Sequence, residues 1–276
     1  MTLKRFYMSS MIWTITIKSS DTDVEVLACY FQTYIDAEIF VLSGTAKKSR
    51  VIDISSFSRT LGHDICRALP GLHSLSGCDS VSAFSGKGKS KFFDVLIRNQ
   101  NFTETLISIG NSFEISEELF RKVESFVCAV YRFPFNDLNE VRFIVFCKSK
   151  QIQCHQLPPT KDAFKRHVQR ANFQAAVWKR AFLPNYVLPS LDSHGWIIEN
   201  NVLCIQWIDQ QPASEALMLL ISCGCKTNCS TRRCSCVSQG LACTDGCKCG
   251  EACQNSTQRA SIDDTDDESD EETEQE

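Results

Sequence analysis

Hydrophobic and polar positions follow two different periods in the first half of the chain. Between residues 12 and 17 every second side chain is apolar (Trp13, Ile15 and Ile17), which predicts a β-strand. Residues 24–34 have the spacing of an amphipathic helix, residues 38–42 and 50–54 favour strands, and residues 57–68 again favour a helix. This succession predicts an α/β fold for the N-terminal part of the chain.

The pattern after residue 110 is mainly helical. Residues 112–131 predict a helix, and the short apolar run 141–147 fits a strand or a helix equally well. Residues 196–208 indicate a hairpin that turns at residues 199–201. Residues 160–182 predict a long helix with Thr160 as its N-cap. Its apolar stripe consists of Phe164, His167, Val168, Ala171, Ala175, Trp178 and Phe182.

The helix predicted over residues 160–182 is also strongly basic. It carries six basic side chains against a single acidic one, Asp162. The six are Lys161, Lys165, Arg166, Arg170, Lys179 and Arg180. One interpretation is a basic surface that faces nucleic acid. The simpler interpretation, which we prefer, is the solvated polar face of a helix that packs on the core.

The formal net charge of −4 hides an uneven distribution. Ten acidic residues and no basic ones lie between Ser261 and Glu276, and the rest of the chain has 29 basic against 23 acidic residues. A tail of this composition cannot bury apolar surface, so we predict that it is disordered. The mildly basic remainder is compatible with a polyanionic partner. No apolar run is long enough for a membrane span, so we expect no membrane partner.

Nine of the 16 cysteines are crowded into residues 223–253. They form three pairs whose members are one residue apart, and a single cysteine follows each pair. Such close pairs are poorly placed for an internal disulfide but can bind one metal ion or two neighbouring ions. The other seven cysteines are scattered among apolar residues, as buried free thiols are. This segregation predicts a reducing compartment and a metal site. The predicted ligands are Cys223, Cys225, Cys229, Cys234, Cys236, Cys243, Cys247, Cys249 and Cys253.

The number of these cysteines suggests a stoichiometry. Zinc in structural sites has four ligands in a tetrahedron. Nine thiolates complete three such tetrahedra if three of the thiolates each bridge two ions, and no cysteine is then left over. The residues between the cysteines are mostly small and polar. Zinc binding must therefore supply most of the folding free energy of this segment.

The stretch from Cys223 to Cys253, with GLAC at 240–243 and CKC at 247–249, resembles the tesmin-like CXC family, also called cysteine-rich CRC domains. The resemblance implies zinc binding and DNA contact. With three zinc ions the segment has a total charge of only about −1, so DNA contact would depend on the local pair Arg232 and Arg233. The alternative is a zinc-bound cap that binds no nucleic acid.

Two aspartates follow the first predicted strand. Asp21 and Asp23 lie where open α/β sheets place their active sites, at the carboxyl end of a strand. Carboxylates two residues apart can share a divalent cation. The alternative is local: Asp21 or Thr22 caps the following helix, and Asp23 lies in its first turn.

Residues 77–96 contain a third carboxylate, Asp79, which precedes a predicted short helix, a glycine turn at 85–88 and an amphipathic helix. Glycines between two helices allow backbone N–H groups to approach a phosphate. Gly86 and Gly88, together with Lys87 and Lys89, therefore predict a helix–hairpin–helix that binds the nucleic-acid backbone without reading its sequence.

Residues 15–97 combine the two aspartates, the sequence GCD and the glycine hairpin, and they resemble the PIN-like superfamily of flap (XPG-type) nucleases. The resemblance implies that Asp21, Asp23 and Asp79 bind catalytic magnesium and that the hairpin holds duplex DNA. Members of the family have further acidic residues upstream. No acidic residue precedes Asp21 here, so we expect an incomplete two-metal site. The nuclease-like and cysteine-rich parts in this order also resemble mobile-element-like proteins of animal genomes.

These patterns predict four parts. They are a PIN-like α/β domain with a helix–hairpin–helix at 12–150, a helical connector with a hairpin at 151–217, a CXC zinc-cysteine module with little regular secondary structure at 218–255, and a disordered acidic tail at 256–276. The leading functional hypothesis is zinc-dependent DNA binding in the nucleus, without catalysis. The alternatives are a magnesium-dependent, structure-specific DNA endonuclease and a zinc-scaffolded chromatin module whose acidic tail binds basic proteins.

Overall fold

A three-stranded sheet begins the part of the chain that the structure describes. This structure, a computed structural model, describes residues 13–45, 48–148, 154–209, 222–226, 228–238, 240–244, 247–249 and 253–256. The chain divides into two compact units, residues 1–209 and residues 210–276, which are considered separately below. None of the helices in the described ranges has the length and hydropathy of a membrane span.

The sheet has the strand order β1-β2-β3. Strand β1 (Trp13–Lys18) is followed by helix α1 (Thr22–Gln32) and strand β2 (Ala37–Thr45). Strand β2 pairs in parallel with β1. Strand β3 (Lys48–Asp53) pairs antiparallel with β2. Ile39 and Val41 of β2 are buried against Cys29 of α1, together with residues of the next two helices. The predicted mixed α/β character of this region is confirmed, because the strand and helix periods in the sequence reflect these half-buried elements.

In the described part of the first unit, eight helical segments lie between the sheet and the long helix α8 (Lys161–Lys179). They are α2 (Ile54–Leu61), α3 (His63–Ser76), α4 (Lys89–Arg98), η1 (Gln100–Phe102), α5 (Thr103–Ser108), α6 (Glu117–Val130), α7 (Leu138–Lys148) and η2 (Cys154–Gln156). The single helix expected over residues 57–68 is in fact two helices. Gly62 separates them with φ +86°, a conformation that a glycine adopts without strain.

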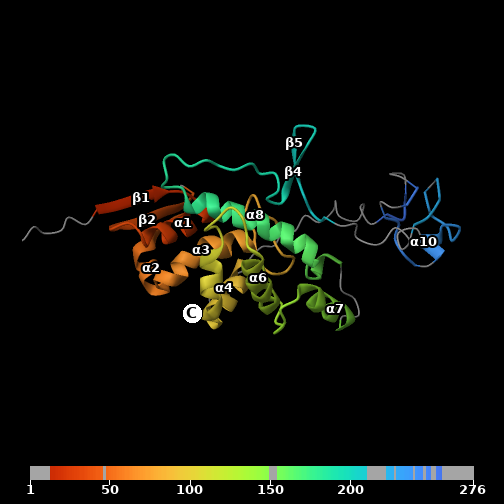
Figure 1. Cartoon of the computed structure of the whole chain (residues 1–276), viewed down its shortest axis with the longest axis horizontal. Helices are drawn as coiled ribbons and strands as arrows, with labels where there is room; N and C mark the ends of the chain where they lie inside the picture. The colour runs from red at the N-terminus through yellow and green to blue at the C-terminus, as the bar shows by residue number, and fades with distance from the viewer. Residues whose placement is uncertain are drawn as a thin grey trace, which may run out of the picture. The chain divides into compact units, whose positions relative to one another are not determined.

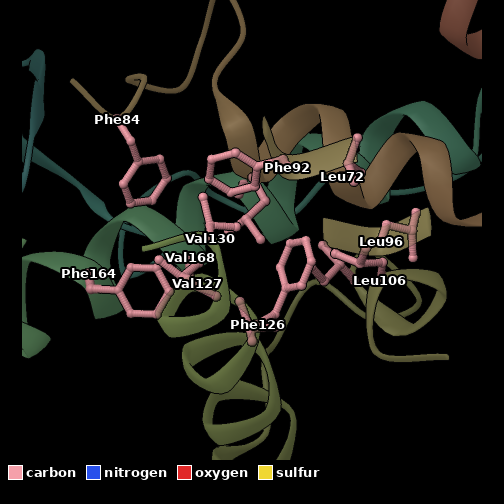
Figure 2. Close-up of a cluster of buried hydrophobic side chains, with 14 of the residues drawn as sticks. Leu72, Phe84, Phe92, Leu96, Leu106, Phe126, Val127, Val130, Phe164 and Val168 are labelled. Carbon is pink, nitrogen blue, oxygen red and sulfur yellow. The ribbon is translucent and has the colours of Figure 1, made fainter. Parts of the chain in front are cut away.

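The main core lies between helices that are distant in sequence. Phe92 of α4, Phe126 of α6 and Phe164 of α8 (Lys161–Lys179) are fully buried, and Figure 2 shows these rings gathered with Leu96, Leu106 and other apolar side chains. In Figure 1, α8 runs across α3 and α6. Helix α8 is therefore part of the first unit's core rather than of a separate connector, since its apolar stripe packs within that core.

A short hairpin completes the first unit. Strands β4 (Trp196–Glu199) and β5 (Val202–Ile205) pair antiparallel, and Asn200 and Asn201 form the turn with φ +50° and +62°. Asparagine tolerates this left-handed conformation, which two-residue hairpin turns require. The expected turn position is confirmed.

The second unit has little regular secondary structure in its described residues. The helix there is α10 (Ser235–Ser238), and the buried side chains are cysteines. The acidic tail predicted at 256–276 lies outside the described residues except for Ser256.

Candidate metal centre

Backbone hydrogen bonds bring the cysteine-bearing loops of the second unit together. The N–H of Lys248 donates to the carbonyl of Cys223 at 3.0 Å, and the N–H of Cys243 donates to the carbonyl of Asn255 at 2.6 Å. These bonds join residues 25 and 12 positions apart in a segment whose described residues form no strand. The cysteines are thus held at the centre of the unit while the polar residues between them face solvent.

Seven cysteine sulfurs form three overlapping groups of four. Within each group, all sulfurs lie within 4.8 Å of one another. Cys243 belongs to all three groups, and Cys223, Cys229 and Cys249 each belong to two. The groups are Cys223, Cys229, Cys234, Cys243; Cys223, Cys243, Cys247, Cys249; and Cys229, Cys243, Cys249, Cys253. Shared cysteines are what a cluster with bridging thiolates requires.

The distances between these sulfurs match those of a tetrahedral metal site. The Sγ atoms of Cys223 and Cys229 are 3.7 Å apart, and Cys243 Sγ lies 4.0 Å from Cys223 Sγ and 3.8 Å from Cys234 Sγ. A zinc–sulfur bond of about 2.3 Å gives a tetrahedron with an edge of about 3.8 Å. All 16 cysteines are free thiols in the structure, and all 16 lie in the described residues. The donor set therefore fits metal ions that prefer soft, tetrahedral ligands.

The electrostatic environment differs from one thiol to the next. The backbone N–H of Val237, at the start of α10, outweighs the opposing effect of burial and lowers the pKa of Cys234 to about 6. Burial raises the pKa of Cys249 to about 11 and the pKa of Cys236 to about 12, and the crowded neighbouring thiols contribute to both shifts. Because metal ions bind the thiolates, metal binding to this cluster releases protons and weakens as the pH falls.

Two of the nine predicted ligands lie at the edge of the groups. The Sγ atom of Cys236 is 3.7 Å from that of Cys247, and Cys225 is half-buried and packs against the cluster. All nine cysteines are therefore in one cluster, as expected, but the four-sulfur groups contain seven of them. The identity and number of the ions stay predictions.

One residue at the cluster was not anticipated. The side-chain amide of Asn255 donates to Cys243 Sγ at 3.3 Å and to the carbonyl of Leu241 at 2.9 Å. Donors to a coordinating thiolate orient it and tune its charge. The sequence pattern could not show this contact, because an asparagine just after the last cysteine has no spacing rule that links it to Cys243.

The three aspartates proposed as magnesium ligands have other contacts. Asp21 caps α1 by accepting the N–H of Asp23 at 2.9 Å, and Asp23 Oδ1 lies 2.5 Å from Nε2 of the buried His73. Asp79 is exposed in the tight turn between Cys78 and Val81. In the described ranges, the groups of three or more close metal-ligand atoms consist of cysteines, so the structure does not bring these carboxylates together. Magnesium binding stays a prediction that this arrangement does not favour.

The glycine hairpin differs from its expected form. The short helix expected after Asp79 is wrong: residues 77–88 form two tight turns, closed by the pairs Cys78–Val81 and Phe84–Lys87. Local hydrogen bonds across each turn replace helical ones, and Gly86 adopts φ +64°. A Cβ added at Gly86 or Gly88 would meet no atom within 4 Å, so the backbone here is open to a ligand.

The lysines of this hairpin are not equivalent. The ammonium of Lys87 lies over the Tyr131 ring, 4.9 Å from its centroid, and burial lowers its pKa. Lys91 donates to the carbonyl of Gly86 at 2.5 Å. Lys89 is exposed and has no hydrogen bond or ion pair with any residue that the structure describes. Only Lys89 of the three is thus fully available to a ligand.

The six basic residues of α8 and its C-terminal cap are engaged within the first unit. Lys165 pairs with Glu117 at 2.8 Å, and the buried Arg170 donates to the carbonyls of Gly195 and Gln206, both at 2.9 Å. The remaining partners are Glu124 and Asp137 for Lys161, Asp209 for Arg166, Ile107 and Asn111 for Lys179, and Gly110, Asn111 and Ala176 for Arg180. This favours the structural interpretation of the basic pattern over a nucleic-acid surface.

Comparisons with protein-family models, with curated proteins and with the solved structures find no match to this chain. The functional argument therefore depends on the residues and geometry described above.

Proposed function

We propose that this protein binds zinc through its cysteine cluster and binds nucleic acid through the surface that the cluster supports. The observation that carries the proposal is the set of three overlapping four-sulfur groups with tetrahedral edge lengths. A segment whose described buried side chains are all cysteines gains a fixed shape from such a site. The resemblance to CXC domains supports zinc as the metal and DNA as the partner.

The basic side chains of the second unit support nucleic-acid contact. Lys226, Arg232, Arg233 and Lys248 are all exposed, although the cysteines beside them are buried. Arg232 and Arg233 immediately precede Cys234, so the metal cluster fixes the backbone that carries them. A fixed backbone holds the two arginines next to each other, and the planar, always-charged guanidinium suits bidentate contact with phosphate despite the low total charge of the unit.

We do not propose catalysis. The aspartates that the nuclease resemblance would make catalytic act as a helix cap, as a partner of His73 and as an exposed turn residue. The proposed function places the protein in the nucleus, where thiols stay reduced and DNA is the polyanion at hand.

The metal part of the proposal predicts a stoichiometry. Native mass spectrometry of the purified chain is expected to show three zinc ions. The Cys243→Ala variant should lose at least one of them, because Cys243 belongs to every four-sulfur group. The Cys154→Ala variant, which removes an exposed thiol outside the cluster, is the matched control and should keep all three. A zinc-free chain with disulfides within residues 223–253 would contradict the proposal.

The nucleic-acid part is tested with the double variant Arg232→Ala/Arg233→Ala. If both arginines contact phosphates, the slope of log K against log salt concentration for duplex DNA becomes shallower by about 1.8, and affinity at low salt falls at least about tenfold. Fluorescence anisotropy over a salt series measures both. The double variant Arg121→Ala/Lys122→Ala removes two adjacent exposed charges from α6 and should bind as the wild type does. If Arg232→Ala/Arg233→Ala binds DNA as the wild type does, the second unit is a zinc-bound cap that does not contact nucleic acid through these arginines.

A further inference from the structure

The first unit contains an apolar cavity enclosed by α1, β3 and the helices α2, α3 and α4. Its volume is about 520 Å³, within the range of roughly 300–1,000 Å³ that small-molecule sites occupy. The walls come from five elements and include Val26 of α1, Ile52 of β3, Phe57 of α2, Leu72 of α3 and Phe93 of α4.

The charged side chains that line this cavity lie at its rim, and the buried ring of His73, whose Nε2 lies 2.5 Å from Asp23 Oδ1, also lines it. Lys89 and Ser90, in the first turn of α4, are both exposed and line the opening. Glu25 and Arg50 also line it, but they pair with each other at 3.5 Å. Lys89 has no such partner in the described part of the chain. The rim therefore carries one uncompensated positive charge.

The start of α4 adds to this positive potential. Gly88 occupies the N-cap position and supplies no side-chain acceptor to the first N–H groups of the ten-residue helix. Unpaired N–H groups and the helix dipole favour an anion at this end. The cavity walls, by contrast, offer an apolar ligand body a place to bury its surface.

We propose that this cavity binds a free single-chain amphipathic anion, an alkyl carboxylate of medium chain length. The alkyl chain lies among Val26, Leu72 and Phe93, and the carboxylate accepts hydrogen bonds from Lys89 at the rim. The charge of the rim selects an anionic head over a cationic one, and the apolar walls select chain length. This site is separate from the metal centre and does not depend on the function proposed for it.

Isothermal titration calorimetry of the zinc-loaded full chain tests the site with hexanoate and decanoate. Each buried methylene should strengthen binding about fourfold, so decanoate is expected to bind about two hundredfold more tightly than hexanoate. Lys89→Gln should weaken decanoate binding about tenfold, and decylammonium should bind at least tenfold more weakly than decanoate. Lys122→Gln, which removes an exposed lysine beside a different cavity of similar volume, is the matched control and should change nothing.

A second variant fills the cavity. Val26→Phe places a ring in the space and should abolish decanoate binding without lowering the melting temperature of the chain. Equal affinities for the two carboxylates, or no effect of Lys89→Gln, would overturn the proposal. It would also be wrong if sedimentation showed a dimer that Val26→Phe dissociates, because a second copy would then cover the cavity.

Discussion

His167 is a titratable side chain buried in the core of the first unit. Its Nε2–H donates to the carbonyl of Leu75 at 2.8 Å, and its Nδ1 lies 3.3 Å from the hydroxyl of Ser82. The ring packs edge-on against Phe84. Burial lowers the pKa of His167 to about 4, and the nearby charge of Arg170 adds to the effect. His167 is therefore neutral in the folded chain between about pH 4 and 6.5, where an unperturbed histidine would be protonated.

This shift predicts acid sensitivity. The unfolded chain binds a proton on His167 below a pH of about 6.5, whereas the folded chain binds it only below about 4. The free energy of unfolding should therefore fall by roughly 3 kcal/mol as the pH is lowered through this window. Urea titrations followed by tryptophan fluorescence measure it, because all four tryptophans lie in residues 1–209.

The variant His167→Gln supplies the reference for that measurement. Glutamine keeps an N–H donor for the carbonyl of Leu75 but does not titrate. The free energy of unfolding of the wild type minus that of the variant, followed against pH, therefore isolates the contribution of His167. If this difference in unfolding free energy stays constant between pH 6.5 and 4, the buried imidazole does not cause the acid sensitivity.

At the scale of elements, the crossing of α3 and α5 depends on one small residue. A Cβ added at Gly71, inside α3, would lie 2.2 Å from the carbonyl oxygen of Leu106. Helix propensity favours alanine over glycine by about 1 kcal/mol, but a contact with backbone this short requires the two helices to separate. Packing therefore outweighs propensity at this position.

The substitution Gly71→Ala should lower the free energy of unfolding by roughly 1–3 kcal/mol, the cost of overpacking a core. Urea unfolding of the full chain measures this. The control is Gly88→Ala, where φ is −68° and a Cβ would meet no atom within 4 Å, so the change should stay below about 1 kcal/mol, the usual scale of an N-cap effect. Stabilisation by Gly71→Ala would mean that α3 and α5 are farther apart than described.

At the scale of the whole molecule, the two units are stabilised in different ways. The first has a continuous apolar core of side chains from α3 to α8. In the second, the buried side chains of the described residues are cysteines. Thiols alone supply little hydrophobic free energy at this size, so we expect the fold of the second unit to depend on bound metal.

Chelation should therefore unfold one unit and leave the other folded. After zinc removal by EDTA, amide hydrogens of residues 222–256 should exchange at the rate of an unfolded chain, while the urea midpoint reported by tryptophan fluorescence stays unchanged. Hydrogen exchange with mass spectrometry separates the two regions. Loss of protection in the first unit as well would show that its fold depends on the metal.

The elements with strong local patterns could be predicted from the sequence. The alternation around Ile15 and Ile17 predicted β1, the N-cap Thr160 and its apolar stripe predicted α8, and Asn200 and Asn201 predicted the hairpin turn. The cysteine spacing likewise predicted one sulfur cluster, because ligands must come from nearby positions in a segment with no other core.

Only the tertiary structure could show which residues far apart in the sequence contact one another. His73 contacts Asp23 across 50 positions, and the bases of α8 bind acids and carbonyls on other elements, so both groups have structural partners that the sequence did not reveal. The cavity beside Lys89 combines walls from five elements. The sequence by itself determined local periodicity and metal-ligand chemistry, since both depend on spacing along the chain. Packing in three dimensions determined which charges are neutralised and where an apolar space remains, since both depend on which surfaces meet.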